Sequence, residues 1–210
     1  MRPIYIGPYT PAAASTTAFN AQGFTSTGAA TAPTTTATTD GLAHYVTLTS
    51  PSQASLAGVN FTIVGTDADG HAVTNTIAGP ASASTVTSTV FFKTVTTIQP
   101  SATMGALTLA VGIAVTAITQ TIPLTNSPAA AGMTVAVTGT VNYTMYETFA
   151  NVYEHDANSV STPITALTSK SANTSGSAAV SATGVLLLIN SVSTGATVAV
   201  WLNQNSAGLA

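Results

Sequence analysis

The stretch Asp67-Ala68-Asp69-Gly70 comes closest in this sequence to a metal-binding motif. An EF-hand loop needs oxygen ligands at fixed spacing, a glycine at its sixth position and a glutamate at its twelfth. If Gly70 is that glycine, the loop ends at Thr76 instead of a glutamate. If Asp67 is the first ligand, Ala72 occupies the glycine position. Neither register supplies a calcium site.

The residues on either side of this stretch favour a different interpretation. Apolar residues and threonines alternate over 61–64 and again over 73–77, as in two strands. An Asp-x-Asp-Gly sequence between two such strands is typical of a hairpin turn, in which Gly70 supplies the positive φ. We therefore predict a turn here, in which the carboxylates matter little.

A second polar cluster, Glu154-His155-Asp156, follows Glu147 by seven residues. Carboxylates beside a histidine could act as a general acid and base or hold a metal. Adjacent residues rarely converge on one point, however, and a chain with few charges should place them in solvated loops. His44 and His71 are expected to be packed or surface residues. The sequence has no G-x-S-x-G elbow and no glycine-rich phosphate loop. We expect no enzyme, and no catalytic, cofactor-binding or metal-ligating residue.

An aromatic set surrounds the same region and could serve in binding. It comprises Tyr143, Tyr146, Phe149 and Tyr153. Such rings could stack on a sugar or on a neighbouring chain, although packing in the core or in an interface is the simpler interpretation.

Charge is scarce throughout the chain. Charged residues make up 4% of the 210 residues, whereas ordinary globular chains contain about 25%. Threonine fills about a fifth of the sequence. A soluble monomer with so little charge would be poorly solvated, so we expect neighbours in an assembly to cover much of its surface. Three basic residues and a net charge of −3 argue against nucleic-acid binding. The absence of cysteine excludes disulfides and thiol chemistry.

The elements that would carry these residues are strands. Large apolar residues fall on alternate positions from Leu107 to Val115 within the apolar stretch 104–118, which predicts a strand over 106–118 and not a membrane helix. No stretch at the N-terminus has the apolar length of a signal peptide, so we expect the chain to stay in the cytosol or to assemble from there. Further strands are predicted at 42–48, 55–65, 71–77, 84–98, 133–145, 161–169, 184–192 and 196–204, with a loop over 169–184.

The sequence thus predicts an all-β fold with two β-sandwich domains, Ig-like or jelly-roll-like, and an extended N-terminal arm. The arm covers 1–24, where Pro3, Pro8 and Pro11 favour extended backbone. A low-complexity segment over 25–41 is a linker or lies along the surface. The first domain covers 42–120 and the second 121–210. A short loop, Ser193-Thr194-Gly195, is expected to join the last two strands as a hairpin.

Two long stretches resemble structural proteins of tailed bacteriophages. The first half resembles their Ig-like β-sandwich modules through GVNFTIVGTDADGHAVTNTIAGP and STVTSTVFFKTVTTIQPSA. The second half is similar to small all-β virion proteins through TVAVTGTVNYTMYETFANVYE and the final strands. Gly139-Thr140, Tyr143-Thr144, Thr194-Gly195 and Gln204 match that second pattern.

The resemblance implies a non-enzymatic structural protein of a tailed-bacteriophage virion, with a multi-copy head decoration or cement role expected first. The alternatives are a tail or neck component, such as an adaptor, nozzle-associated or fibre protein, and a carbohydrate-binding module using the Tyr143–Tyr153 aromatics. The implied partners are other copies of the chain and the major capsid or tail proteins, in a homo-oligomer, without nucleic acid, membrane or cofactor. The implied location is the virion, assembled in the host cytoplasm.

Overall fold

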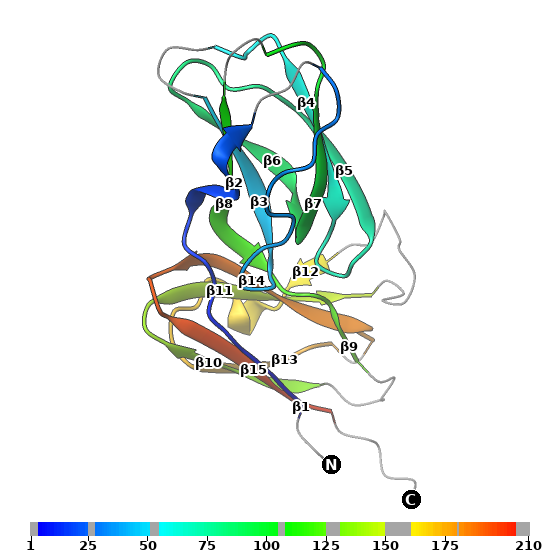
Figure 1. Ribbon diagram of the computed structural model, residues 1–210. Helices are drawn as coiled ribbons and strands as arrows, with labels where there is room; N and C mark the ends of the chain where they lie inside the picture. Colours follow the sequence, from blue (N-terminus) through cyan, green and yellow to red (C-terminus); the bar gives the residue numbers. More distant parts are fainter. Residues whose placement is uncertain are drawn as a thin grey trace, which may run out of the picture. The chain divides into compact units, whose positions relative to one another are not determined.

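The computed structural model describes residues 4–24, 28–50, 55–104, 108–124, 131–149, 161–179 and 181–204. These residues form antiparallel strands, with one short 3-10 helix at Thr165–Leu167, so the all-β prediction is confirmed (Figure 1). The strands belong to three antiparallel sheets. None of the helical structure in the described ranges is long and apolar enough to cross a membrane.

The chain divides into two compact units. The middle unit comprises Ala13–Ala117, and the terminal unit combines Met1–Ala12 with Ile118–Ala210. The segment 1–24, expected as one arm, is therefore divided between the units. Its first strand, β1 (Ile4–Tyr9), pairs with the last strand of the same chain, β15 (Thr197–Asn203). Its second strand, β2 (Ser15–Phe24), pairs with β8 (Leu109–Ile118) in the middle unit.

The middle unit contains seven strands in two groups. One group has the order β6-β3-β8-β2, and the other has the order β5-β4-β7. The remaining bounds are β3 (Ala43–Thr49), β4 (Asn60–Thr66), β5 (Ala72–Ala78), β6 (Thr85–Phe92) and β7 (Thr94–Pro100). Large apolar side chains from these strands are buried, among them Phe19, Val46, Phe61, Ile63, Phe92, Ile98, Leu109 and Val111. The segment 28–41 contacts β7 through the bridges Thr31↔Ile98 and Ala37↔Thr94.

The terminal unit contains two groups of four strands, which lie one over the other in Figure 1. The first has the order β1-β15-β10-β13, with β10 at Gly132–Thr138 and β13 at Thr174–Ser177. The second contains β12 (Ser161–Pro163), β11 (Val141–Thr148), β14 (Gly184–Val192) and β9 (Ile122–Pro123). Buried side chains from both groups form its core, among them Met133, Val135, Tyr143, Met145, Leu187, Ile189, Val198, Val200 and Leu202.

Several stretches predicted as single strands or hairpins instead pass from one group of strands to another. The run 84–98 bends at Lys93, so that β6 pairs with β3 whereas β7 pairs with β4. The run 133–145 turns at Gly139, whose φ is 77°. β14 and β15 are joined by a short turn but pair with different strands, so the expected hairpin is wrong. The loop predicted over 169–184 contains β13, and the strand predicted over 161–169 gives way to the 3-10 helix.

Candidate functional site

The Asp67–Gly70 stretch forms the predicted hairpin turn between β4 and β5. The pairing runs without interruption from Asn60↔Ala78 to Thr66↔Ala72. Gly70 has a φ of 90°, as the turn requires. Oδ1 of Asp67 accepts the backbone amides of Asp69 and His71, each at 2.9 Å. The Asp67 carboxylate therefore holds the turn, which is a larger role than the sequence suggested.

No metal centre is built around this turn. Oδ2 of Asp67 lies 3.5 Å from Nδ1 of His71. Across the ranges that the structure describes, no three His, Cys, Asp or Glu side chains are grouped closely enough to hold a metal ion. The cluster Glu154-His155-Asp156 lies outside the described residues. Glu147 is described, and its Oε2 accepts the backbone amide of Ala179 at 2.6 Å.

A buried carboxylate–imidazole pair lies in the middle unit, between Asp40 and His44. Nε2 of His44 is 2.8 Å from Oδ2 of Asp40, and the two side chains are 0% and 4% exposed. Nδ1 of His44 lies 2.9 Å from the Ala114 carbonyl oxygen, which can only accept a hydrogen bond. Nδ1 therefore donates, and one further hydrogen lies between Nε2 and Asp40. Asp40 also accepts the Leu42 amide at 3.1 Å.

This pair resembles part of a catalytic triad in composition but not in geometry. A base that activates a hydroxyl needs one ring nitrogen directed at the nucleophile. Both nitrogens of His44 already have partners within the fold. The buried hydroxyl of Ser88 is used elsewhere, since it donates to the Val90 carbonyl and accepts the Val46 amide. The pair therefore has a structural role, tying the chain before β3 to β8.

The described members of the aromatic set around β11 differ in exposure, with Tyr143 in the core and Tyr146 half-buried. Tyr143 is completely buried, and its hydroxyl donates to the Ala172 carbonyl at 2.9 Å. Burial raises the pKa of Tyr143 above its ordinary value of 10.0, and a hydrogen bond with Thr174 partly opposes this shift. Phe149 is 45% exposed, whereas Tyr153 lies outside the described residues. Core packing, the simpler interpretation, holds for Tyr143.

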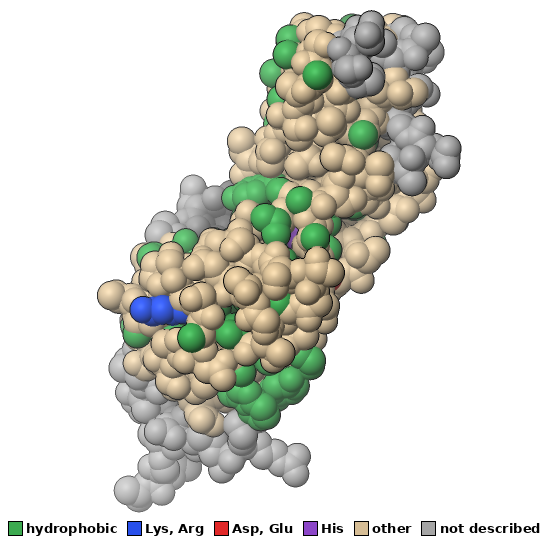
Figure 2. Space-filling view, turned by 90° about the vertical axis from the view of Figure 1, so that its left-hand side faces the viewer, with side chains coloured by type: hydrophobic (Ala, Val, Ile, Leu, Met, Phe, Trp, Pro, Cys, Tyr) green, Lys and Arg blue, Asp and Glu red, His purple; other side chains and the backbone are tan. Residues whose placement is uncertain are grey.

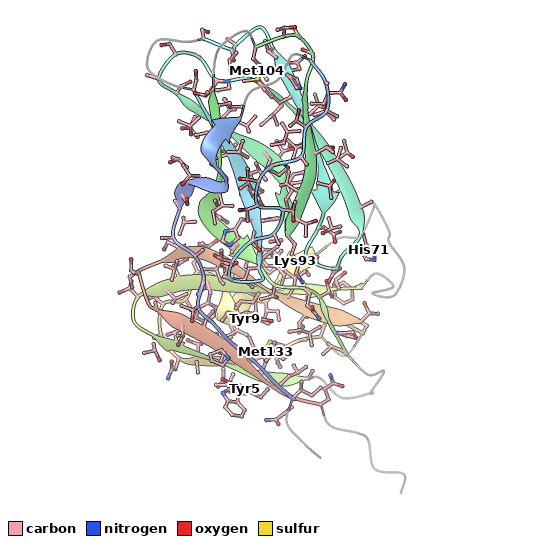
Figure 3. All side chains as sticks on the ribbon, in the orientation of Figure 1. Tyr5, Tyr9, His71, Lys93, Met104 and Met133 are labelled. Carbon is pink, nitrogen blue, oxygen red and sulfur yellow. The ribbon has the colours of Figure 1, made fainter. Side chains whose placement is uncertain are left out.

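An exposed aromatic pair lies elsewhere, on the outer face of the β1–β15 strand pair. Tyr5 and Trp201 occupy opposite positions in the antiparallel register. Their ring centroids are 4.4 Å apart with an interplanar angle of 46°. They are 45% and 43% exposed, and Figure 3 shows Tyr5 directed away from the sheet. One member of this pair could be found from the sequence, because Trp201 alternates with Val198, Val200 and Leu202 and so falls on the opposite face of the strand.

This pair begins a row of outward side chains that crosses the whole sheet. Thr134 on β10 lies opposite Trp201, and Ser175 on β13 lies opposite Thr134. The two hydroxyls bond to each other at 2.8 Å. The adjacent outward row contains Asn203, Gly132 and Ser177. Two aromatic rings and a set of uncharged polar groups therefore share one face.

The middle unit carries an open groove of about 380 Å³. Its lining includes Ser15 on β2, Thr47 on β3, Thr85 on β6 and Ile113 on β8. None of the lining residues is charged. The groove therefore offers shape and a few hydroxyls, but no group that could act as an acid, a base or a metal ligand.

Comparisons of this chain with protein-family models, with curated proteins and with solved structures find no match.

Proposed function

We propose that this chain is a non-enzymatic structural subunit that works in many copies within a larger assembly. The motif resemblance favours a tailed-bacteriophage virion as that assembly, with head decoration or cementing as the role. The proposal includes the finer fold, in which each unit is an Ig-like or jelly-roll-like β-sandwich. Its partners would be copies of itself and the major capsid or tail proteins.

The observation that carries the proposal is the way exposed hydroxyls on neighbouring strands bond to each other. Two exposed pairs, Thr49–Thr85 and Thr62–Thr76, join adjacent strands in this way, as does the part-buried pair Thr66–Thr94, with oxygens 2.7 to 3.0 Å apart. Removing a polar group from water is costly when its hydrogen bonds are lost. Hydroxyls that already have protein partners lose less, so a neighbour can cover these faces at reduced cost.

The distribution of charge supports the same proposal. Three of the described carboxylates serve their own fold: Asp40 bonds to His44, Asp67 holds a turn and Glu147 accepts a backbone amide. Figure 2 shows a face on which uncharged side chains and backbone predominate. Few charges are therefore left to solvate the surface or to repel a second copy.

Sedimentation of the purified protein tests the multi-copy part of the proposal. We expect a closed oligomer at micromolar concentration, because repeated positions on a particle impose symmetry. A single monomeric species over the whole concentration range would contradict it.

Imaging of particles labelled with an antibody against the chain tests the location. Label distributed over the head would support decoration, and label confined to one vertex or along the tail would support the adaptor, nozzle-associated or fibre alternative. Particles that carry no label would refute the virion assignment, whatever the sedimentation result.

A further inference from the structure

We propose that the outer face of the β1-β15-β10-β13 sheet binds a neutral oligosaccharide. We call this surface the Tyr5–Trp201 face and define it by Tyr5, Trp201, Thr134, Ser175, Ser177 and Asn203. The inference is independent of the virion assignment, because it depends only on residues of the terminal unit.

The aromatic pair supplies the stacking part of such a site. Sugar rings present faces of C–H groups, which pack against the electron-rich faces of aromatic rings, while the sugar hydroxyls point sideways. Tyr5 and Trp201 are tilted by 46° and each leaves more than two fifths of its surface exposed. Because the rings contact each other, each restricts the rotation of the other. The stacking surface is therefore held in place before a ligand arrives, which lowers the entropic cost of binding.

The polar groups beside the rings supply the hydrogen-bonding part. Thr134 and Ser175 continue the aromatic row onto the next two strands. Neighbouring strands lie about 4.8 Å apart, so a row across four strands is about 14 Å long, enough for a short oligosaccharide. In the next row, Gly132 separates Asn203 from Ser177. Because Gly132 has no side chain, the surface dips between these two polar side chains. A Cβ at this position would have room, since its nearest neighbouring atom would lie 4.0 Å away.

The absence of charge selects a neutral sugar over other ligands. No residue in the four strands β1, β10, β13 and β15 carries a formal charge. Nucleic acids, phosphorylated lipids and acidic polysaccharides need basic groups, and the described residues of these four strands supply none. A second protein copy would favour a broad apolar centre, whereas the two outward rows place hydroxyl and amide groups beside the two rings, with Ile4 as the one further exposed large apolar residue of these four strands.

Trp201 is the only tryptophan in the chain, so its fluorescence reports directly on this face. The experiment titrates the intact protein with four neutral hexasaccharides, built from β-1,4-glucose, α-1,4-glucose, β-1,4-xylose and N-acetylglucosamine. We expect a saturable change in emission with at least one of them. Tyr5→Ala should weaken that binding about tenfold or more, which corresponds to about 1.4 kcal/mol. Thr134→Val, which keeps the side-chain shape but removes the hydroxyl, should weaken it as well.

Two control variants make the result specific. Phe149→Ala removes an aromatic ring of equal exposure from outside this face and should leave the affinity unchanged. Tyr5→Phe keeps the stacking ring and should retain most of the affinity. No saturable change with any of the four sugars would overturn the proposal, as would equal binding by wild type and Tyr5→Ala. A fluorescence change that depends on protein concentration, not on sugar, and that disappears in Tyr5→Ala would assign the face to contact between copies.

Discussion

Replacement of Asp40 tests whether the buried pair with His44 acts through its hydrogen bonds. In Asp40→Ala, Nε2 of His44 loses its partner in a fully buried position, and the Leu42 amide loses its acceptor. Removing one member of a buried pair typically costs about 3–5 kcal/mol, because the other member stays buried without compensation. We expect the free energy of unfolding to fall by an amount in that range.

Asp40→Asn is the matched variant, since it has the same shape without the charge. The asparagine oxygen can still accept the Leu42 amide, and its NH₂ group can donate to Nε2 while Nδ1 donates to the Ala114 carbonyl. All these hydrogen bonds are thus kept with a neutral imidazole, so the expected cost is below about 1 kcal/mol.

Urea unfolding followed by circular dichroism measures both losses, and hydrogen exchange of β3 assigns them to the middle unit. An Asp40→Ala protein as stable as wild type would refute the structural role of the pair. If Asp40→Asn cost as much as Asp40→Ala, charge and not hydrogen bonding would be the stabilising element.

The other predictions concern backbone constraints and alkaline pH. Gly70→Val should cost about 1–2 kcal/mol in urea unfolding because of its positive φ, and calcium should not change the melting temperature of either protein. Gly112→Ala should lower the free energy of unfolding by more than about 3 kcal/mol, because the new Cβ would overlap the Ser15 carbonyl oxygen. Gly58→Ala is the control: its Cβ meets no atom within 4 Å, so it should change the free energy of unfolding by less than about 0.5 kcal/mol. Burial raises the folded-state pKa of Tyr143, so the folded state holds the phenolic proton more tightly than the unfolded state does. The resulting contribution to the free energy of unfolding is complete below pH 10.0 and is lost as the pH rises through the folded-state pKa. Stability measured above pH 10.0 should therefore fall less steeply in Tyr143→Phe than in wild type, and equal slopes would contradict the assignment.

The positions of most strands could be predicted from the sequence, but not their partners. Alternation of apolar and polar residues located β3, β5 and β14 to within about a residue, because burial of one face determines that pattern. The same alternation continues through Lys93 and Gly139, where the chain changes sheet. Local periodicity shows that one face of a strand is buried, but it does not show which sheet the strand joins. The turns at Gly139 and Ser193 meet, with the Ser193 amide bonded to the Thr140 carbonyl at 2.9 Å.

The aromatic residues show the same limit at the level of a candidate site. Tyr143 shares its phase on β11 with Val141 and Met145, so its burial in the core could be predicted from the sequence. Trp201 occupies the outward phase of β15, and that could be read from its apolar neighbours. Its contact with Tyr5 could not, because nearly the whole sequence separates the two residues and only the β1–β15 pairing brings them together.

That pairing of the two ends of the chain imposes an order on biosynthesis. All residues of the middle unit leave the ribosome before β15 is made, so this unit can fold while translation continues. The β1 strand must wait for its partner, on the order of 10–40 s at about 5–20 residues per second. The Tyr5–Trp201 contact is thus among the last to form, and a chain that stops before β15 never acquires it. Completion of the terminal unit therefore requires synthesis through β15, and a chain that stops before it leaves the β15-facing edges of β1 and β10 unpaired, where chaperones and proteases can bind.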